Sequence, residues 1–188
     1  MSILVFSGSS RTGSINTQLA KVAATAAEKR GGDVQFLDMA DYVLPLYNGD
    51  LEEAEGIPEN VLELKALFSA AEGFIIATPE YNSGITPMLK NVIDWTSRAA
   101  SQDDPPLSAW RGKVAGLVAA SPGPLGGIRG LPIVRLILSN IGVTVLPGDV
   151  AVGMAAFNDD GTLTNEGHQG RVEKLAADVV RVTKALRA

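Results

Sequence analysis

The stretch ILVFSGSSRTGS, residues 3–14, joins a short apolar run to a loop of small and polar residues. A helical pattern follows, because apolar residues recur at helical spacing from Leu19 to Ala26, and Gly31-Gly32 ends it. An apolar strand, a polar turn and an amphipathic helix in this order form one β–α repeat. The start of the chain therefore indicates an α/β fold.

The same alternation continues to the end of the chain. Further apolar runs predict strands at residues 34–37, 74–78, 114–119 and 143–146, with helical patterns between them and after the last one. Strands that read as continuous apolar runs are typical of a parallel sheet covered on both faces. We expect a doubly wound, five-stranded parallel sheet with helices on both faces, in a single domain over residues 1–188. The acid-rich segment 41–58 is predicted to be a surface loop.

Composition narrows the class of protein. With 46% hydrophobic and 20% charged residues, the chain is typical of globular rather than disordered proteins. The net charge of −5 argues against nucleic-acid binding, which needs a basic surface. There is no cysteine, which excludes disulfides, thiolate metal sites and a cysteine nucleophile. No apolar run reaches the length of a membrane span and no signal-peptide pattern begins the chain, so we expect a cytoplasmic protein without membrane or nucleic-acid partners.

Three polar loops follow predicted strands one, three and four, at residues 7–14, 79–84 and 121–130. If the strand order is 2-1-3-4-5, these strands are neighbours. The loops would then line one crevice at the topological switch point, where open α/β sheets bind ligands. The loops after strands two and five are not expected to belong to this cluster.

The first loop suits a phosphate group. It combines hydroxyls, main-chain amides, one guanidinium and the start of a helix. It lacks both the P-loop lysine and the Gly-x-Gly-x-x-Gly pattern, so a terminal monophosphate fits better than a pyrophosphate. The alternative is an ordinary βα loop that uses Ser14 or Asn16 as a helix cap. For the second loop the alternative is a simple turn, and for the glycine-rich third loop it is a flexible connection.

Residues 79–82, PEYN, followed by LKNVIDWTSR at 89–98, resemble the signature of the NADPH-dependent FMN reductase family, which includes bacterial chromate, quinone and ferric reductases. GSSR at 8–11 with Ser14 and Asn16 is similar to its phosphate loop. SPG at 121–123, with Gly126-Gly127 and Arg129, is similar to its third flavin loop.

This resemblance implies a flavodoxin-like fold that holds FMN without a covalent bond. It implies an NAD(P)H-dependent oxidoreductase with NADPH or NADH as co-substrate. Hydride would pass through FMN to a small-molecule electron acceptor in a ping-pong cycle. The resemblance also implies a homodimer or homotetramer. No catalytic side chain or metal is expected. The implied cofactor-binding residues are Ser9, Arg11, Ser14, Asn16 and Thr17 for the phosphate; Pro79, Glu80, Tyr81, Asn82, Ser83 and Gly84 for the ring and ribityl groups; and Ser121, Gly123, Gly126 and Gly127 on the other side.

One segment departs from the family pattern. A hydroxyl expected at position 84 is absent, since the chain reads Ser83-Gly84-Ile85-Thr86-Pro87. Two alternatives to a reductase remain open: a flavodoxin-like electron carrier, and a flavin-binding module without turnover. The acceptor is also open among quinones, ferric chelates, chromate, azo compounds and free flavin.

Other chemistry-bearing residues have simpler interpretations. His168 is the only histidine and is predicted to be a solvated residue at a helix start, because no cysteine or second histidine can complete a metal site. Asp94, Trp95 and Arg98 are predicted to be structural, on a helix against a neighbouring subunit. Trp110 and Tyr42 either border the flavin or pack.

Overall fold

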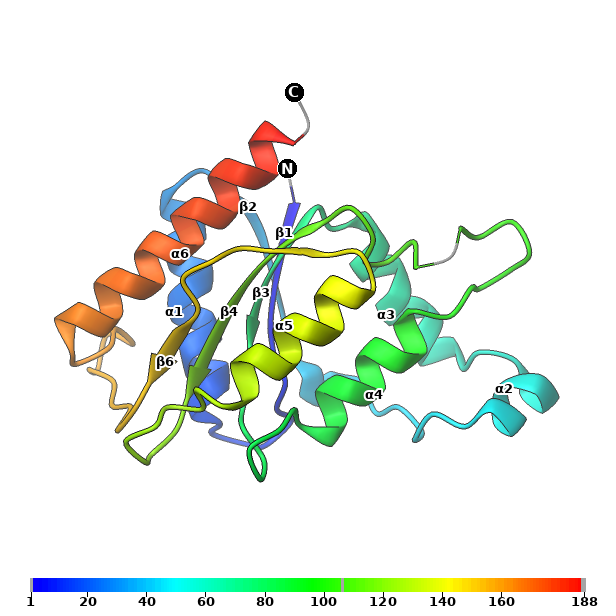
Figure 1. Ribbon diagram of the computed structural model, residues 1–188, viewed down its shortest axis with the longest axis horizontal. Coiled ribbons are helices and arrows are strands. Elements are labelled where there is room, and N and C mark those ends of the chain that lie inside the picture. The colour runs from blue at the N-terminus through cyan, green and yellow to red at the C-terminus, as the bar shows by residue number, and fades with distance from the viewer. Residues whose placement is uncertain (1, 106, 187–188) are drawn as a thin grey trace.

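Parallel strands are arranged in the order β2-β1-β3-β4-β5 in the computed structural model, which describes residues 2–105 and 107–186 (Figure 1). Met1, Pro106, Arg187 and Ala188 belong to the predicted domain and lie outside the described residues. The order and the parallel pairing confirm the predicted doubly wound sheet. The strands are β1 (Ser2–Ser7), β2 (Asp33–Leu37), β3 (Gly73–Ala77), β4 (Val114–Ala120), β5 (Thr144–Val145) and β6 (Val150–Val152).

The strand predicted at 143–146 is present as β5, but the fifth strand position is divided between β5 and β6, and the sequence did not predict β6. The start of β4 pairs with β5, and the end of β4 pairs with β6. Leu146 still donates to the carbonyl of Ala115, but Pro147 has no amide to continue the ladder. Gly148 then turns the chain with a φ of 91°. The sheet of the described residues therefore has six strands instead of five.

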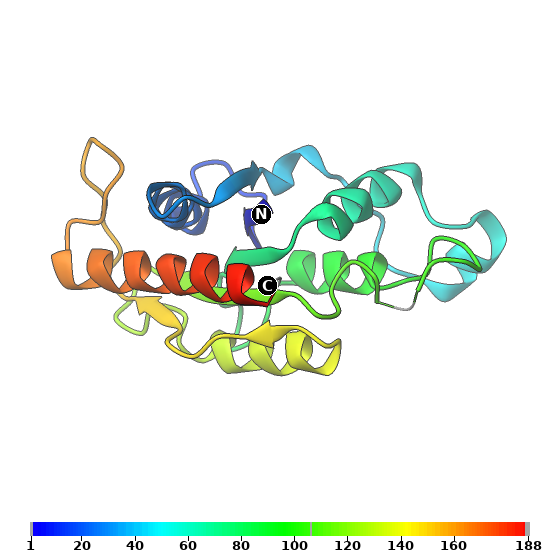
Figure 2. The same cartoon turned by 90° about the horizontal axis from the view of Figure 1, so that it is seen from above.

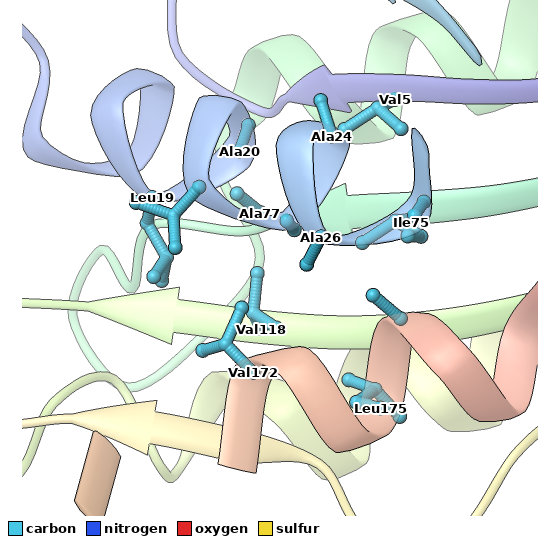
Figure 3. Close-up of a cluster of buried hydrophobic side chains, with 14 of the residues drawn as sticks. Val5, Leu19, Ala20, Ala24, Ala26, Ile75, Ala77, Val118, Val172 and Leu175 are labelled. Carbon is cyan, nitrogen blue, oxygen red and sulfur yellow. The ribbon is translucent and has the colours of Figure 1, made fainter. Parts of the chain in front are cut away.

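Helices cover both faces of the sheet, as expected (Figure 2). Successive residues of a strand point to opposite faces. The helices are α1 (Ile15–Lys29), α2 (Gly49–Glu55), α3 (Glu59–Ala70), α4 (Pro87–Thr96), α5 (Gly130–Asn140) and α6 (Glu166–Ala185), with a 3₁₀ turn, η1 (Met39–Asp41). Val5 therefore packs with residues of α1 and α6 (Figure 3), as does Ile3, and Leu4 and Phe6 pack with residues of α3, α4 and α5 on the other face.

Segment 41–58 is not a continuous loop, because it contains α2. Asn48 caps this helix, with its side-chain oxygen 2.8 Å from the amide of Asp50. Asp50 and Glu52 lie in the first turn, where negative charge is favourable. The acids interpreted as a solvated loop therefore also stabilise a helix start.

The start of α4 follows directly from the sequence. Thr86 caps α4 through its side chain, and Pro87 occupies the first helical turn. Within residues 2–105 and 107–186, no helix combines the length and hydropathy needed to cross a bilayer.

Candidate cofactor site

Three loops lie along the carboxyl edge of the sheet, at the bottom of Figure 1. They are the first loop (residues 8–14, after β1), the second loop (78–86, after β3) and the third loop (121–129, after β4). Because β1, β3 and β4 are adjacent, the topology places these loops side by side. The first two also touch, since the Thr86 hydroxyl donates to the carbonyl of Gly8 at 2.8 Å.

The first loop combines a capped helix start with free positive charge. The side-chain oxygen of Ser14 accepts from the main-chain amide of Thr17 at 3.4 Å. The side-chain oxygen of Ser9 accepts from the main-chain amide of Arg11 at 3.3 Å. Helix α1 carries no acid in its first turn. Arg11 is exposed, and among the described residues its guanidinium has no partner. The positive end of α1 and Arg11 are therefore both available to an anion.

Asn16 uses its side chain differently from its neighbours in the first loop. It is buried, and its amide exchanges two hydrogen bonds with the main chain of Ala120 at the end of β4. Asn16 does not cap α1, which is the role of Ser14.

The second loop contains a tight two-residue turn. Tyr81 and Gly84 exchange both main-chain hydrogen bonds, at 3.1 and 3.0 Å. Asn82 and Ser83 between them have φ values of 51° and 67°, which is a type I′ arrangement. The amides of Tyr81 and Gly84 are thus occupied. Those of Asn82 and Ser83 have no acceptor within the described part of the chain, and both residues are exposed.

Glu80 points from the second loop to the third. One carboxylate oxygen accepts from the amides of Arg129 and Gly130, at 2.8 and 3.0 Å, and so caps the start of α5. Burial raises the pKa of Glu80, but the hydrogen bonds from the Arg129 guanidinium and from these amides lower it by more. The pKa of Glu80 therefore lies below its ordinary value, and the carboxylate is charged at neutral pH.

The third loop approaches a segment that the sequence did not assign to this edge. Met154 donates to Gly123 at 2.9 Å and Ala155 to Ser121 at 3.1 Å. A Cβ on Gly126 would lie 2.6 Å from the amide nitrogen of Gly153. The prediction that the chain after the fifth strand stays outside the cluster was therefore wrong. The one indication of this contact in the sequence was the glycine directly after the apolar run 150–152.

The remaining predicted residues are placed as follows. Pro79 is buried, Tyr81 is 52% exposed, and Thr17, Ser121, Gly123 and Gly84 are partly exposed. Gly127 is buried at a φ of 83°, where a Cβ would lie 2.9 Å from that of Ala119. Ser7 was placed in the first loop by the sequence but not among the cofactor-binding residues, and its buried hydroxyl at the end of β1 has no hydrogen-bond partner within residues 2–105 and 107–186.

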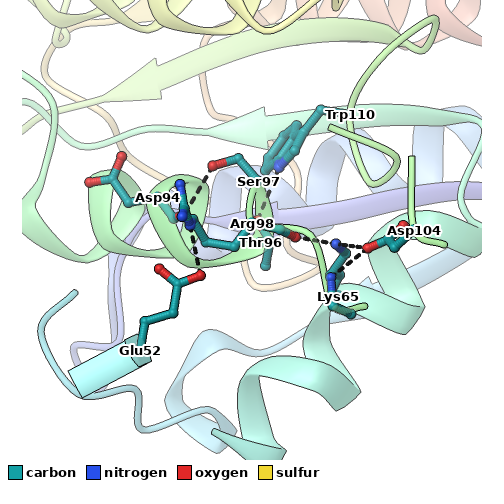
Figure 4. A network of polar contacts seen from close by, with 9 residues as sticks. Glu52, Lys65, Asp94, Thr96, Ser97, Arg98, Asp104 and Trp110 are labelled. Carbon is teal, nitrogen blue, oxygen red and sulfur yellow. Dashed lines mark hydrogen bonds and ion pairs between the residues drawn. The ribbon is translucent and has the colours of Figure 1, made fainter. Parts of the chain in front are cut away.

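A polar network away from the three loops contains residues whose roles the sequence left open or predicted to be structural (Figure 4). Trp110 is fully buried and donates to the Thr96 hydroxyl at 3.0 Å, so it packs. Trp95 is also buried and donates to the carbonyl of Pro45. Arg98 forms an ion pair with Glu52 at 2.9 Å.

Neither His168 nor a carboxylate cluster offers a metal site. His168 lies in the first turn of α6. Its pKa is lowered mainly by burial and also by the positive charge of the nearby Arg171. Within the described residues, no group of three potential metal ligands occurs. A cavity of about 260 Å³ lies between α1, residues 160–162 and α6, and none of its lining residues belongs to the three loops.

Comparisons with known proteins agree with this arrangement. The family described as NADPH-dependent FMN reductase matches residues 1–157. A probable NADPH:quinone oxidoreductase 2 of Oryza sativa is 38% identical over 135 residues, 71% of this chain and 62% of its own. A quinone reductase of Pseudomonas putida strain KT2440 is 33% identical over 168 residues, 88% of this chain and 86% of its own. The chain thus spans less than two thirds of the rice protein and most of the bacterial one.

Solved structures extend the likeness to the whole fold. The flavoenzyme NAD(P)H:(acceptor) oxidoreductase FerB of Paracoccus denitrificans superposes with a TM-score of 0.82 at 28% identity, over 98% of this chain and 97% of its own. An archaeal flavodoxin superposes with a TM-score of 0.62 at 14% identity, over 98% and 99%, which shows the shared flavodoxin-like fold. With its three loops, its parallel sheet and a sequence match over residues 1–157, this chain belongs to the NADPH-dependent FMN reductase family.

Proposed function

We propose that the protein is an NAD(P)H-dependent FMN oxidoreductase that reduces a small acceptor of the quinone type. The observation that carries the proposal is the convergence of the first, second and third loops on one sheet edge, in a chain that belongs to the FMN reductase family. The relatives named as quinone reductases and as an NADPH:quinone oxidoreductase support the choice of acceptor. We also infer one domain over the whole chain.

The residues at this edge fit FMN. A phosphate dianion needs amides, hydroxyls and positive charge, which the start of α1, Ser9 and Arg11 supply. The hydroxyl of Ser7, at the end of β1 beside this loop, is buried and has no partner in the described part of the chain. A flat ring needs close approach of the main chain, which the glycines of the third loop permit. The donor set therefore suits a flavin mononucleotide.

In this proposal the three loops have separate tasks. The first loop holds the phosphate through Ser9, Arg11 and the amides that begin α1. The free amides of Asn82 and Ser83 lie on the second loop, where they can donate to the ring edge and stabilise negative charge. The third loop excludes water on the other side. When bound, FMN supplies the two-electron chemistry, and the protein orients it. No acid–base pair is required of the chain.

A homo-oligomer is part of the proposal. Large apolar side chains are exposed on the third loop, on α5 and directly after β6: Leu125 at 52%, Ile128 at 54%, Leu136 at 70% and Met154 at 72%. Exposed apolar side chains gathered in one region mark interaction surfaces. We infer that a second copy of the chain covers them, as a dimer or tetramer. The proposed location is the cytoplasm, where NAD(P)H is available.

The test is an absorbance spectrum after addition of FMN and desalting, followed by anaerobic NADPH or NADH and then a benzoquinone. A retained flavin spectrum that bleaches with NAD(P)H and returns with the quinone supports the reductase. Retained flavin that NAD(P)H does not bleach indicates a carrier or a module without turnover. A protein that holds no flavin refutes the proposal.

A further inference from the structure

The side chain of Asn16 completes the hydrogen-bond ladder at the end of β4. Its Nδ2 donates to the carbonyl of Ala120 at 2.9 Å, and its Oδ1 accepts from the amide of Ala120 at 2.9 Å. A primary amide carries the donor and the acceptor of a peptide group. Asn16 therefore pairs with Ala120 as a residue of a neighbouring strand would.

Strand β3 does not pair with Ala120, because β3 ends before it reaches the level of this residue. Thr78 still donates to Val118 at 2.8 Å, and alternate residues of β4 direct their polar groups to the same side, so Ala120 also faces β3. By the same alternation, Glu80 would supply the next amide that faces β4, but β3 ends at Ala77 and does not reach it. Without Asn16, the buried amide and carbonyl of Ala120 would have no protein partner on that side.

This contact lies at the junction of the whole candidate site. Asn16 stands in the first turn of α1, directly after the first loop, and Ala120 directly precedes the third loop. The two residues are 104 positions apart in sequence. The two hydrogen bonds fix both the distance and the orientation between the start of α1 and the end of β4. One side chain therefore holds the first and third loops in place relative to each other.

We propose that Asn16 is a positioning residue that couples the phosphate-binding loop to the third loop, and that its side chain does not bind the phosphate. This inference rests on the proposed function. Asn16 is 3% exposed and its oxygen is occupied, whereas Ser10, Arg11 and Thr12 are exposed. The main-chain amide of Asn16 remains available to an anion, since the first amides of a helix have no intrahelical acceptor.

The experiment compares FMN with riboflavin, which lacks the phosphate. Dissociation constants for both are measured by flavin fluorescence quenching for the natural protein, Asn16→Ala, Arg11→Ala and the control Gln18→Ala, an exposed residue of α1. We expect Asn16→Ala to weaken both flavins by the same factor, about tenfold, because a lost pair of buried hydrogen bonds is worth about that much. Arg11→Ala should weaken FMN alone, and Gln18→Ala neither.

Amide hydrogen exchange at Ala120 gives a readout that needs no flavin. Exchange should be slow in the natural protein and faster in Asn16→Ala, and intermediate in Asn16→Asp, which keeps an acceptor for the Ala120 amide but loses the donor for its carbonyl. Selective loss of FMN affinity in Asn16→Ala would overturn the inference in favour of a phosphate ligand. Faster exchange with unchanged affinity for both flavins would overturn it in favour of a purely structural role. A natural protein that bound neither flavin would refute the proposed function and the coupling with it, while exchange would still report the contact.

Discussion

The carboxylate of Glu80 reaches from the second loop to Arg129 in the third, with 2.6 Å between Glu80 Oε1 and Arg129 Nη2. The Glu80 side chain is 8% exposed and that of Arg129 is 56% exposed, so the anion is buried and the cation faces solvent. An ion pair with an exposed partner is worth little by itself. The same carboxylate, however, also caps α5. Its main effect is therefore to hold the third loop and the start of α5 against the second loop.

Replacing Glu80 with alanine should loosen this junction. We expect Glu80→Ala to lower the free energy of unfolding by about 1–2 kcal/mol, the usual cost of a lost helix cap, and to weaken FMN binding. Glu80→Gln keeps an oxygen acceptor and should lose less than half as much. Urea denaturation and FMN titration measure the two effects. Glu53→Ala, at an exposed position of α2, is the control. Equal effects of Glu80→Ala and Glu53→Ala would contradict the capping role.

The turn of the second loop stores conformational strain at Ser83. A φ of 67° is unfavourable for a residue with a Cβ, and type I′ turns prefer Asn-Gly at their centre. Ser83→Gly should therefore raise the free energy of unfolding by about 0.5 kcal/mol, after the added flexibility of the unfolded chain is subtracted. Asn82→Gly is the matched control, because asparagine already tolerates this conformation. Thermal unfolding tests the difference, and a gain in Asn82→Gly alone would show that the strain lies elsewhere.

The pH dependence of stability should depend on Asp104. The amide of Ala100 and the ammonium of Lys65 lower the pKa of Asp104 from 3.8 to about 2. A depressed pKa stabilises the folded state above the unfolded pKa, and this stabilisation is lost as the pH falls through the folded one. The natural protein should thus lose about 1–2 kcal/mol from this group between about pH 4 and pH 2.

Substitution isolates that contribution. Asp104→Asn should be less stable at pH 6 and should show a flatter fall toward pH 2, measured as the free energy of unfolding in urea. Asp103→Asn, at the exposed neighbouring position, should keep the pH dependence of the natural protein. Parallel curves for the natural protein and Asp104→Asn would mean that the contact with Lys65 does not hold in solution.

The sequence was most informative where the pattern is periodic. Continuous apolar runs predicted the strand positions, and the loops after β1, β3 and β4 followed from the strand order. It was least informative where one residue type can serve two roles. Asn16 can contact an anion or replace a peptide group, and only the early end of β3 at Ala77 decides between them. Similarly, the acids near Asp50 are compatible with a loop or with a helix start, and α2 depends on the Asn48 cap.

The sequence shows a glycine at position 153, but it could not identify the residue that approaches it, because Pro124 lies 29 positions earlier in the chain. A Cβ at Gly153 would lie 2.1 Å from the carbonyl oxygen of Pro124 in the third loop. Main-chain atoms on both sides cannot yield as a flexible side chain would. Gly153→Ala should therefore displace the third loop, lower the free energy of unfolding by about 1–3 kcal/mol, and weaken FMN binding.

The control for this prediction is Gly170→Ala. Gly170 lies within α6, and no atom would lie within 4 Å of an added Cβ. Because alanine favours a helix over glycine, Gly170→Ala should stabilise the protein by about 0.5–1 kcal/mol. Opposite signs for the two substitutions in urea denaturation would assign the loss in Gly153→Ala to the contact with Pro124. If Gly153→Ala were stable and bound FMN normally, the segment after β6 would not support the third loop, and the site would consist of the three predicted loops alone.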